Sequence, residues 1–239
     1  MARLSESFAH VEDFSHVDTW VFDLDNTLYP PGLDLWRQID VRMRDYIARF
    51  LGLPLEEAFA VQKDYYRRYG TSLRGLMLEH GMDPAAFLAH AHAIDLSGLD
   101  PAPALGAALA GLPGRKLVYT NGSRGHAEAI LAKLGVAEHI ADVHDIIAAE
   151  FHPKPHAEAY QRFLAAHGVE PRRAAMFEDL ARNLEVPAQL GMRTVLVVPP
   201  AGAGAAHGVR ENWENEGQDG VHIDHVTDDL PDFLARLRR

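Results

Sequence analysis

Two aspartates and a threonine stand at alternate positions directly after a short apolar segment near the start of the chain. Asp23, Asp25 and Thr27 follow the sequence TWVF at residues 19–22. Carboxylates two residues apart in an extended segment share one face and repel each other. A cation, a proton or a substrate must offset that repulsion, so these residues are candidates for a catalytic or metal-binding site.

Three further groups of polar residues follow apolar segments or tight turns later in the chain. They are Thr120 with Asn121, Lys154 between two prolines, and Glu178 with Asp179. Carboxylates, an ammonium group and neutral donors together form the set that a hard oxygen-seeking cation and a phosphate group require. Taken singly, each group has a simpler interpretation as an Asx-turn, a surface lysine or a helix cap.

The elements that position these residues alternate between strand and helix patterns. Strands are expected at 19–23, 116–120, 141–147, 174–177, 193–198 and near 221–226, and helices at 125–134, 155–167, 180–190 and the C-terminus. This alternation predicts an α/β fold with a Rossmann-like parallel sheet covered by helices on both faces. Ligands bind at the carboxyl ends of such strands, which is where the candidate residues stand.

A run of helical patterns without a strand separates the first two expected strands. Its first helix places apolar residues every fourth position before Gly52, and further helices are expected at 55–69, at 72–80 and after Asp83-Pro84. Residues 33–97 are therefore predicted to form a helical subdomain inserted into a core made of residues 1–32 and 98–239.

The composition of the chain argues against several kinds of binding partner and site. The formal net charge of -11 argues against binding to nucleic acid or an anionic membrane, so an anionic substrate would depend on local cations. The chain has no cysteine, which excludes disulfides and thiolate metal sites. It also has no apolar run of membrane-spanning length, and it begins with a polar, acidic stretch. A cytoplasmic protein without a membrane segment is expected.

Two other patterns are read as structural. The 14 histidines are scattered, and His90 and His92 lie two apart in a helical stretch, so they are expected at the surface and not at a metal. The glycine-rich segment 201–208 follows a pair of prolines and precedes a stretch without a helical apolar face. It is expected to be a flexible loop and not a dinucleotide-binding turn.

As an ordered set, the polar groups resemble the four motifs of the haloacid dehalogenase superfamily, over residues 19–198. The matching residues are Asp23, Asp25 and Thr27, then Thr120 and Asn121, then Lys154, then Glu178 and Asp179. The resemblance implies a Rossmann-like core, Mg²⁺ and a phosphoaspartyl intermediate. The helical insert at 33–97 is similar to the cap that closes over the substrate in that superfamily.

The resemblance also implies a role for each residue. Asp23 would be the nucleophile, and Asp25 the general acid and base, which also offers its backbone carbonyl to the metal. Dehalogenases of the superfamily lack a carboxylate at that second position.

The later motifs would bind the phosphate and the metal. Thr120 and Lys154 would hold phosphoryl oxygens, with Asn121 beside them. Asp179 would bind Mg²⁺ directly and Glu178 through water. Asn183 stands where some relatives have an acid, and its role is left open.

Three stretches, FDLDNTLYP, YGTSLRGL and FEDLARNL, are similar to the pyrimidine 5′-nucleotidase branch of the superfamily. This resemblance implies a magnesium-dependent phosphomonoesterase that hydrolyses uridine or cytidine monophosphates. Thr71, Ser72 and Arg74 are the candidate base-binding residues, although taken locally an N-cap and a solvated arginine explain them better. The alternatives are a phosphatase for phosphoglycolate or a sugar phosphate, and a non-catalytic phosphate-binding module. The physiological substrate and the oligomeric state stay open.

Overall fold

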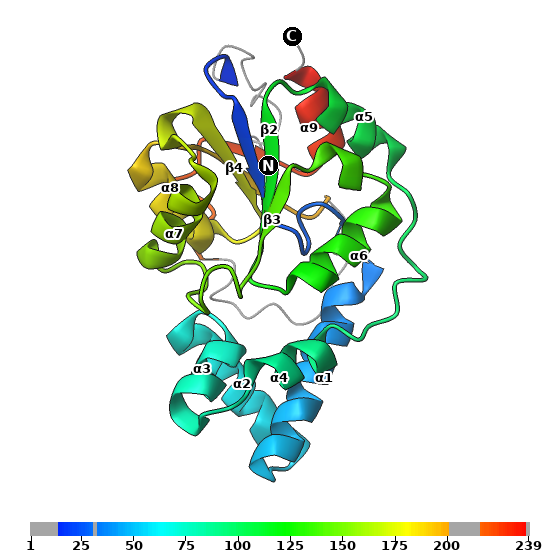
Figure 1. Ribbon diagram of the computed structural model, residues 1–239, viewed down its shortest axis with the longest axis vertical. Helices are drawn as coiled ribbons and strands as arrows, with labels where there is room; N and C mark the ends of the chain where they lie inside the picture. The colour runs from blue at the N-terminus through cyan, green and yellow to red at the C-terminus, as the bar shows by residue number, and fades with distance from the viewer. Residues whose placement is uncertain (1–13, 31–32, 201–215, 238–239) are drawn as a thin grey trace.

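A six-stranded parallel sheet forms the centre of the molecule, seen in a computed structural model that describes residues 14–30, 33–200 and 216–237 (Figure 1). The strand order is β3-β2-β1-β4-β5-β6. Their bounds are β1 Thr19–Phe22, β2 Arg115–Tyr119, β3 Asp142–His144, β4 Ala174–Glu178, β5 Arg193–Val197 and β6 His225–Thr227. The first strand pairs with β2 on one side and β4 on the other, so it is central and buried.

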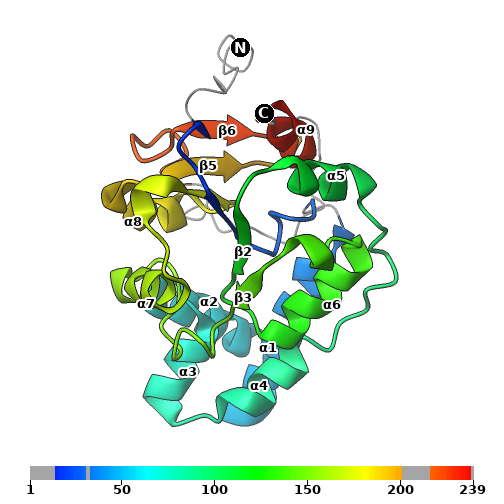
Figure 2. The ribbon, with the colours of Figure 1, turned by 45° about the horizontal axis from the view of Figure 1, so that its top comes forward.

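Helices cover both faces of the sheet because successive strand residues point to opposite sides. Trp20 and Phe22 of β1 pack with apolar residues of α5 (Pro103–Gly111), α6 (Arg124–Leu134) and α9 (Leu230–Arg236). Val21 packs on the other face, against α7 (Ala157–His167) and α8 (Glu185–Leu190). Figure 2 shows the sheet between these two layers. The prediction of a Rossmann-like α/β fold is confirmed.

Four helices between β1 and β2 lie together at one end of the sheet, and we call them the cap (Figures 1 and 2). They are α1 Leu35–Leu51, α2 Leu55–Tyr69, α3 Ser72–His80 and α4 Pro84–Ala91. Their apolar faces share a separate cluster, which also takes in Ile146 and Phe151 from the loop after β3. The cap therefore rests on the core through that loop. The exact domain boundaries at 33 and 97 remain a prediction.

The element predictions fail at three places. Helix α5 was not expected, because its sequence PALGAALAG has little contrast between apolar and polar positions. The helix expected at 180–190 is a 3-10 turn, Ala181–Leu184, followed by α8. Pro187 has no N–H for the Asn183 carbonyl, which accepts from the Tyr160 hydroxyl at 2.6 Å instead. The last strand begins at His225, after a turn that leaves Val221 exposed.

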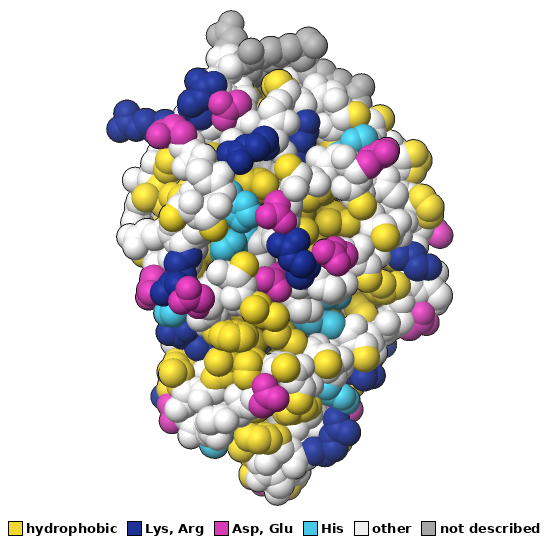
Figure 3. Space-filling view, in the orientation of Figure 1, with side chains coloured by type: hydrophobic (Ala, Val, Ile, Leu, Met, Phe, Trp, Pro, Cys, Tyr) yellow, Lys and Arg dark blue, Asp and Glu magenta, His cyan; other side chains and the backbone are white. Residues whose placement is uncertain are grey.

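The surface gives two further observations. Across the described residues, no helix combines the length and the apolar character that crossing a membrane requires. On the face shown in Figure 3, basic and acidic side chains lie interspersed. The predicted loop at 201–208 lies outside the described residues.

Candidate active site

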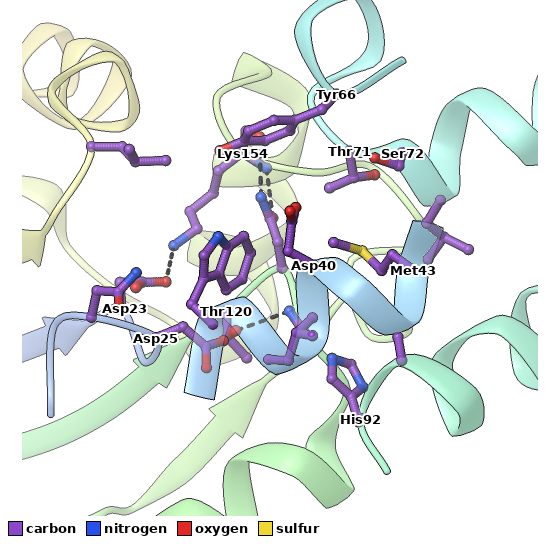
Figure 4. Close-up of a pocket in the computed structure, with 18 of the residues that line it drawn as sticks. Asp23, Asp25, Asp40, Met43, Tyr66, Thr71, Ser72, His92, Thr120 and Lys154 are labelled. Atoms are coloured by element: carbon purple, nitrogen blue, oxygen red, sulfur yellow. Dashed lines mark hydrogen bonds and ion pairs between the residues drawn. The ribbon is translucent and has the colours of Figure 1, made fainter. Parts of the chain in front are cut away.

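The order of the strands brings the polar groups together. Asp23 directly follows β1, Thr120 directly follows β2, and Glu178 ends β4, so three neighbouring strands deliver them to one edge. The Asp23 N–H donates to the Phe177 carbonyl at 2.9 Å, which extends the pairing of β1 and β4 into the site. These side chains line one cavity between the core and the cap, together with Asp179 (Figure 4).

Lys154 is the central cation of the site, and it is almost completely buried. Its Nζ donates to Asp23 Oδ1 at 2.7 Å, to Glu178 Oε1 at 2.7 Å and to the Tyr119 carbonyl at 2.9 Å. Burial alone would lower the pKa of Lys154, but the two carboxylates outweigh it and raise that pKa. The ammonium group is therefore charged, with three acceptors for its three protons.

Asn121 positions Lys154 through its backbone. The Asn121 side chain accepts from the Lys154 N–H at 2.9 Å and donates to the Lys154 carbonyl at 3.2 Å. Thr120 Oγ1 accepts from the Gly122 N–H at 2.9 Å, which orders the loop after β2 and leaves the hydroxyl proton for another acceptor. The sequence placed Asn121 beside Lys154, but it did not predict these two hydrogen bonds to the Lys154 backbone.

Three buried carboxylates form a cluster suited to a metal ion. Oxygens of Asp23, Glu178 and Asp179 lie within 4.8 Å of one another. Burial raises the pKa of Asp23 to about 7; Lys154 acts against this rise, whereas the negative charges of Glu178 and Asp25 add to it. One ammonium group therefore does not neutralise the cluster. An oxygen-only donor set with excess negative charge fits a hard cation such as Mg²⁺.

Glu178 already has partners for both oxygens. Besides Lys154, the Asn183 amide donates to Oε1 at 2.7 Å and the Leu180 N–H donates to Oε2 at 2.9 Å. This arrangement favours contact with a metal through water over direct ligation. It also shows what Asn183 does, which the sequence left open, because its amide orients the Glu178 carboxylate.

Asp25 lines the same cavity and has two donors that sequence reasoning missed. His126 Nε2 lies 2.8 Å from Asp25 Oδ1, and the Tyr29 hydroxyl donates to the same oxygen at 2.6 Å. Burial would raise the pKa of Asp25, but His126 and then Tyr29 outweigh it and lower that pKa. Tyr29 lies one helical turn beyond Asp25 in sequence, which was the available signal. His126 is 101 residues away.

On the cap side, the predicted residues do not all reach the cavity. Thr71 and Ser72 line it, but both hydroxyls serve local structure: Thr71 Oγ1 accepts from the Arg74 N–H at 3.1 Å, and Ser72 Oγ donates to the Gln62 carbonyl at 2.8 Å. Arg74 is not among the lining residues, and its Nη1 donates to the Phe151 carbonyl at 2.6 Å. Arg74 thus links cap to core here, and its base-binding role stays a prediction.

Other cap residues line the cavity in its place. They include Trp36, Asp40, Met43, Gln62, Lys63, Tyr66 and His92, several of which Figure 4 labels. Asp40 Oδ1 accepts from Lys63 at 2.9 Å and from Gln62 at 2.8 Å, which forms a polar group between α1 and α2. The expected surface position is wrong for His92, which is partly buried and faces the site.

A comparison with protein families identifies the kind of enzyme that this geometry belongs to. The family of haloacid dehalogenase-like hydrolases matches residues 17–191, which include every core residue of the site. The chain belongs to this hydrolase family. The predicted superfamily is therefore confirmed, whereas the nucleotidase branch is a matter for proposal.

Solved structures share the fold. The L-2-haloacid dehalogenase from Xanthobacter autotrophicus, with chloropropionic acid covalently bound, is 18% identical, with a TM-score of 0.56 over 91% of this chain and 97% of its own. A defluorinating L-2-haloacid dehalogenase is 18% identical, with a TM-score of 0.54 over 93% and 96%. The UTR4 protein from Saccharomyces cerevisiae is 15% identical, with a TM-score of 0.51 over 90% and 98%. At such identities the likeness concerns the fold alone.

Proposed function

We propose that this hydrolase is a magnesium-dependent phosphomonoesterase that acts through a phosphoaspartyl intermediate on Asp23. The observation that carries the proposal is the Asp25 carboxylate, which lines the same cavity as Asp23 and is fixed by His126 and Tyr29. A second carboxylate supplies an acid and a base beside the nucleophile.

The alternative activity for this fold is displacement of a halide from carbon, as in the dehalogenases. A carboxylate can attack carbon as well as phosphorus, but a halide leaves without a proton. The oxygen of an alkyl phosphate ester leaves as an alkoxide unless an acid protonates it. A phosphate dianion also repels the attacking carboxylate, so its site needs cations close by. Asp25, Lys154 and the acidic cluster therefore favour phosphate chemistry.

The proposed reaction has two displacements. An Asp23 oxygen bonds to phosphorus while the ester P–O bond breaks, and Asp25 gives its proton to the leaving oxygen. Water then attacks the phosphorus of phospho-Asp23 and passes a proton to Asp25, which frees inorganic phosphate and restores both aspartates. Lys154 and Thr120 hold the phosphoryl oxygens throughout.

The metal would be held by residues already in place. Asp23, Asp179 and the Asp25 backbone carbonyl would bind Mg²⁺ directly, and Glu178 through water. When bound, Mg²⁺ supplies positive charge that offsets the repulsion between nucleophile and phosphate.

For the substrate, we propose pyrimidine nucleoside 5′-monophosphates. The sequence resemblance to pyrimidine nucleotidases supports this choice. Trp36 and Tyr66 in the cap provide aromatic rings against which a base can pack. Asp40, Gln62 and Lys63 provide polar groups that can hydrogen-bond to it. Phosphoglycolate and sugar phosphates are the alternative substrates, and a non-catalytic phosphate-binding module is the alternative to an enzyme.

The test is a substrate panel with and without EDTA, followed by reconstitution with divalent metals. The panel contains p-nitrophenyl phosphate, uridine, cytidine and adenosine monophosphates, phosphoglycolate and 2-chloropropionate. We expect Mg²⁺-dependent phosphate release, with the pyrimidine nucleotides highest in kcat/KM. Full turnover in EDTA would refute the metal mechanism, and chloride release without phosphate release would assign a dehalogenase. Equal rates across the phosphates would leave a general phosphatase, and phosphate binding without turnover would indicate the non-catalytic module.

A further inference from the structure

We infer that His126 is a positioning residue that selects which oxygen of Asp25 exchanges the proton, and that His92 from the end of the cap locks His126 in place. This inference rests on the proposed phosphomonoesterase activity. It assigns a catalytic purpose to two histidines that neither the four motifs nor the metal cluster requires.

The first step concerns the Asp25 carboxylate. Both donors, His126 Nε2 and the Tyr29 hydroxyl, bind Oδ1. From the described part of the chain, Oδ2 receives no hydrogen bond. With Oδ1 anchored twice, the carboxyl group cannot rotate freely, so Oδ2 is the oxygen left to carry the proton to the leaving group and to take it from water.

The second step concerns the position of His126. It lies in the first turn of α6, and only about 1% of its side chain is exposed. Burying an imidazole costs free energy that an apolar side chain of similar volume would avoid. The hydrogen-bond partner of its Nε2 is Asp25, which lies 101 residues away in the sequence. A residue needed only for packing would not have to be polar here.

The third step connects His126 to the cap. The ring of His92, the C-cap residue of α4, stacks on the ring of His126 with centroids 4.5 Å apart and planes 12° apart. His92 Nδ1 also lies 2.9 Å from the Ser123 hydroxyl, which ties it to the loop before α6. The end of the cap thus holds the imidazole flat against the residue that orients the acid. Correct placement of α4 therefore completes the alignment of Asp25.

The test uses leaving groups of different quality in the Mg²⁺-loaded enzyme. p-Nitrophenolate leaves without protonation, whereas the ribose oxygen of uridine monophosphate needs the acid. For His126→Leu we expect kcat/KM for uridine monophosphate to fall by about 30–100-fold, toward the lower end of acid catalysis. For p-nitrophenyl phosphate kcat/KM should fall by less than about 5-fold, because its first displacement does not need the acid.

A second signature follows from the base role of Asp25 in the second displacement. In His126→Leu, hydrolysis of phospho-Asp23 should limit p-nitrophenyl phosphate turnover, so a burst of p-nitrophenolate near one equivalent should precede a slow steady rate.

His126→Gln retains a donor near the Nε2 position and should recover most of the activity. His92→Ala should change the ratio of kcat/KM for uridine monophosphate to kcat/KM for p-nitrophenyl phosphate by about 10-fold. His92→Phe keeps a ring that can stack on His126, so it should change this ratio less.

His144→Leu is the matched control. It removes another buried imidazole, from β3, whose Nδ1 pairs with His167 at 3.2 Å and not with Asp25. His144→Leu should lower the free energy of unfolding without changing the ratio of the kcat/KM values for the two esters. Equal losses of kcat/KM on both esters in His126→Leu, without a burst, would overturn the inference. If His126→Leu fails to fold, an unchanged ratio of the two kcat/KM values in His92→Ala would overturn it. A wild type inactive on every phosphate would instead refute the proposed function.

Discussion

At the scale of single residues, the site concentrates negative charge away from water. Asp23, Glu178 and Asp179 are buried, with Lys154 as the ammonium group between the first two. The raised pKa of Asp23, about 7 against an ordinary 3.8, means that the folded protein holds this carboxylate at a cost. The folded state favours the protonated form of Asp23, so this group adds to the free energy of unfolding at low pH. That addition is lost as pH rises from 3.8 through 7.

Asp23→Asn should therefore separate activity from stability. Turnover of p-nitrophenyl phosphate should disappear, because an amide does not attack phosphorus. In EDTA at about pH 8, the melting temperature should equal or exceed that of the wild type, since a buried charge has been removed. Calorimetry of both proteins in EDTA measures the second effect. A strongly lowered melting temperature would mean that Asp23 is needed for the fold.

Asp25→Asn should leave the first displacement possible for a good leaving group and impair the second. Turnover should fall by about 10²–10⁴-fold. Rapid acid quenching and mass spectrometry should find one phosphoryl group on Asp23. A beryllium fluoride adduct should occupy the same carboxylate in a crystal structure, and an adduct on Asp25 would reverse the two roles.

The sequence predicted the residues whose chemistry is evident from type and order. Asp23, Lys154 and Asp179 stand beside strand ends or prolines, so their convergence followed from the strand pattern. His126 and His92 could not be found in this way, because their partners depend on how α4 and α6 meet in space. A scattered histidine carries no periodic signal, and its burial is decided by neighbours far along the chain.

At the scale of elements, one hydrogen bond that joins the cap to the core lies near the site. Arg74→Ala removes the hydrogen bond from α3 to the Phe151 carbonyl, just before Lys154. We expect kcat/KM to fall by similar factors, about 3–10-fold, for uridine monophosphate and p-nitrophenyl phosphate, because a hydrogen bond from a charged group stabilises the cap position. Steady-state kinetics on both esters is the measurement. A loss confined to the nucleotide would restore Arg74 as a base-binding residue.

Packing within the cap depends on one small residue. A Cβ on Gly75 of α3 would lie 2.5 Å from the Cβ of Tyr65 in α2. Gly75→Ala should lower the free energy of unfolding by about 1–3 kcal/mol, because the two helices must move apart. Gly125→Ala, in α6 with no atom near its added methyl group, should be neutral or stabilising. Denaturant titrations of both variants test the contrast, and equal effects would contradict it.

Helices were predicted correctly where apolar residues recur at a helical spacing and a glycine marks the end of the helix. α1 shows both, since its apolar residues recur every fourth position and Gly52 ends it at φ 68°. α5 was missed because alanine and glycine give no face, and only burial of Leu105 and Leu109 against the sheet makes it a helix. The broken helix after Leu180 has a signal in the sequence, Pro187, but the donor that satisfies the Asn183 carbonyl is Tyr160, from another element.

At the scale of the whole molecule, stability should respond to pH through a histidine outside the active site. Burial lowers the pKa of His144 to about 4, and the neighbouring His167 adds to the effect. Between pH 4 and 6.5 this imidazole binds protons more in the unfolded chain than in the folded one, so its contribution to the free energy of unfolding rises with pH. Relative to the wild type, His144→Phe should remove about 1–3 kcal/mol of this rise. Urea titrations at a series of pH values measure this rise. If the free energy of unfolding depends on pH equally in the wild type and in His144→Phe, the assignment is refuted.

The central place of β1 has a consequence for how a cell makes this protein. Translation delivers β1 before its two partners, β2 and β4, and β4 ends only at Glu178. At about 5–20 residues per second, the ribosome releases that last partner roughly 8–30 s after β1. Until then β1 can pair only with β2, and the edge that faces β4 stays open. Asp23 meets Glu178 only afterwards, so the growing polypeptide cannot assemble the acidic cluster before β4 has been made.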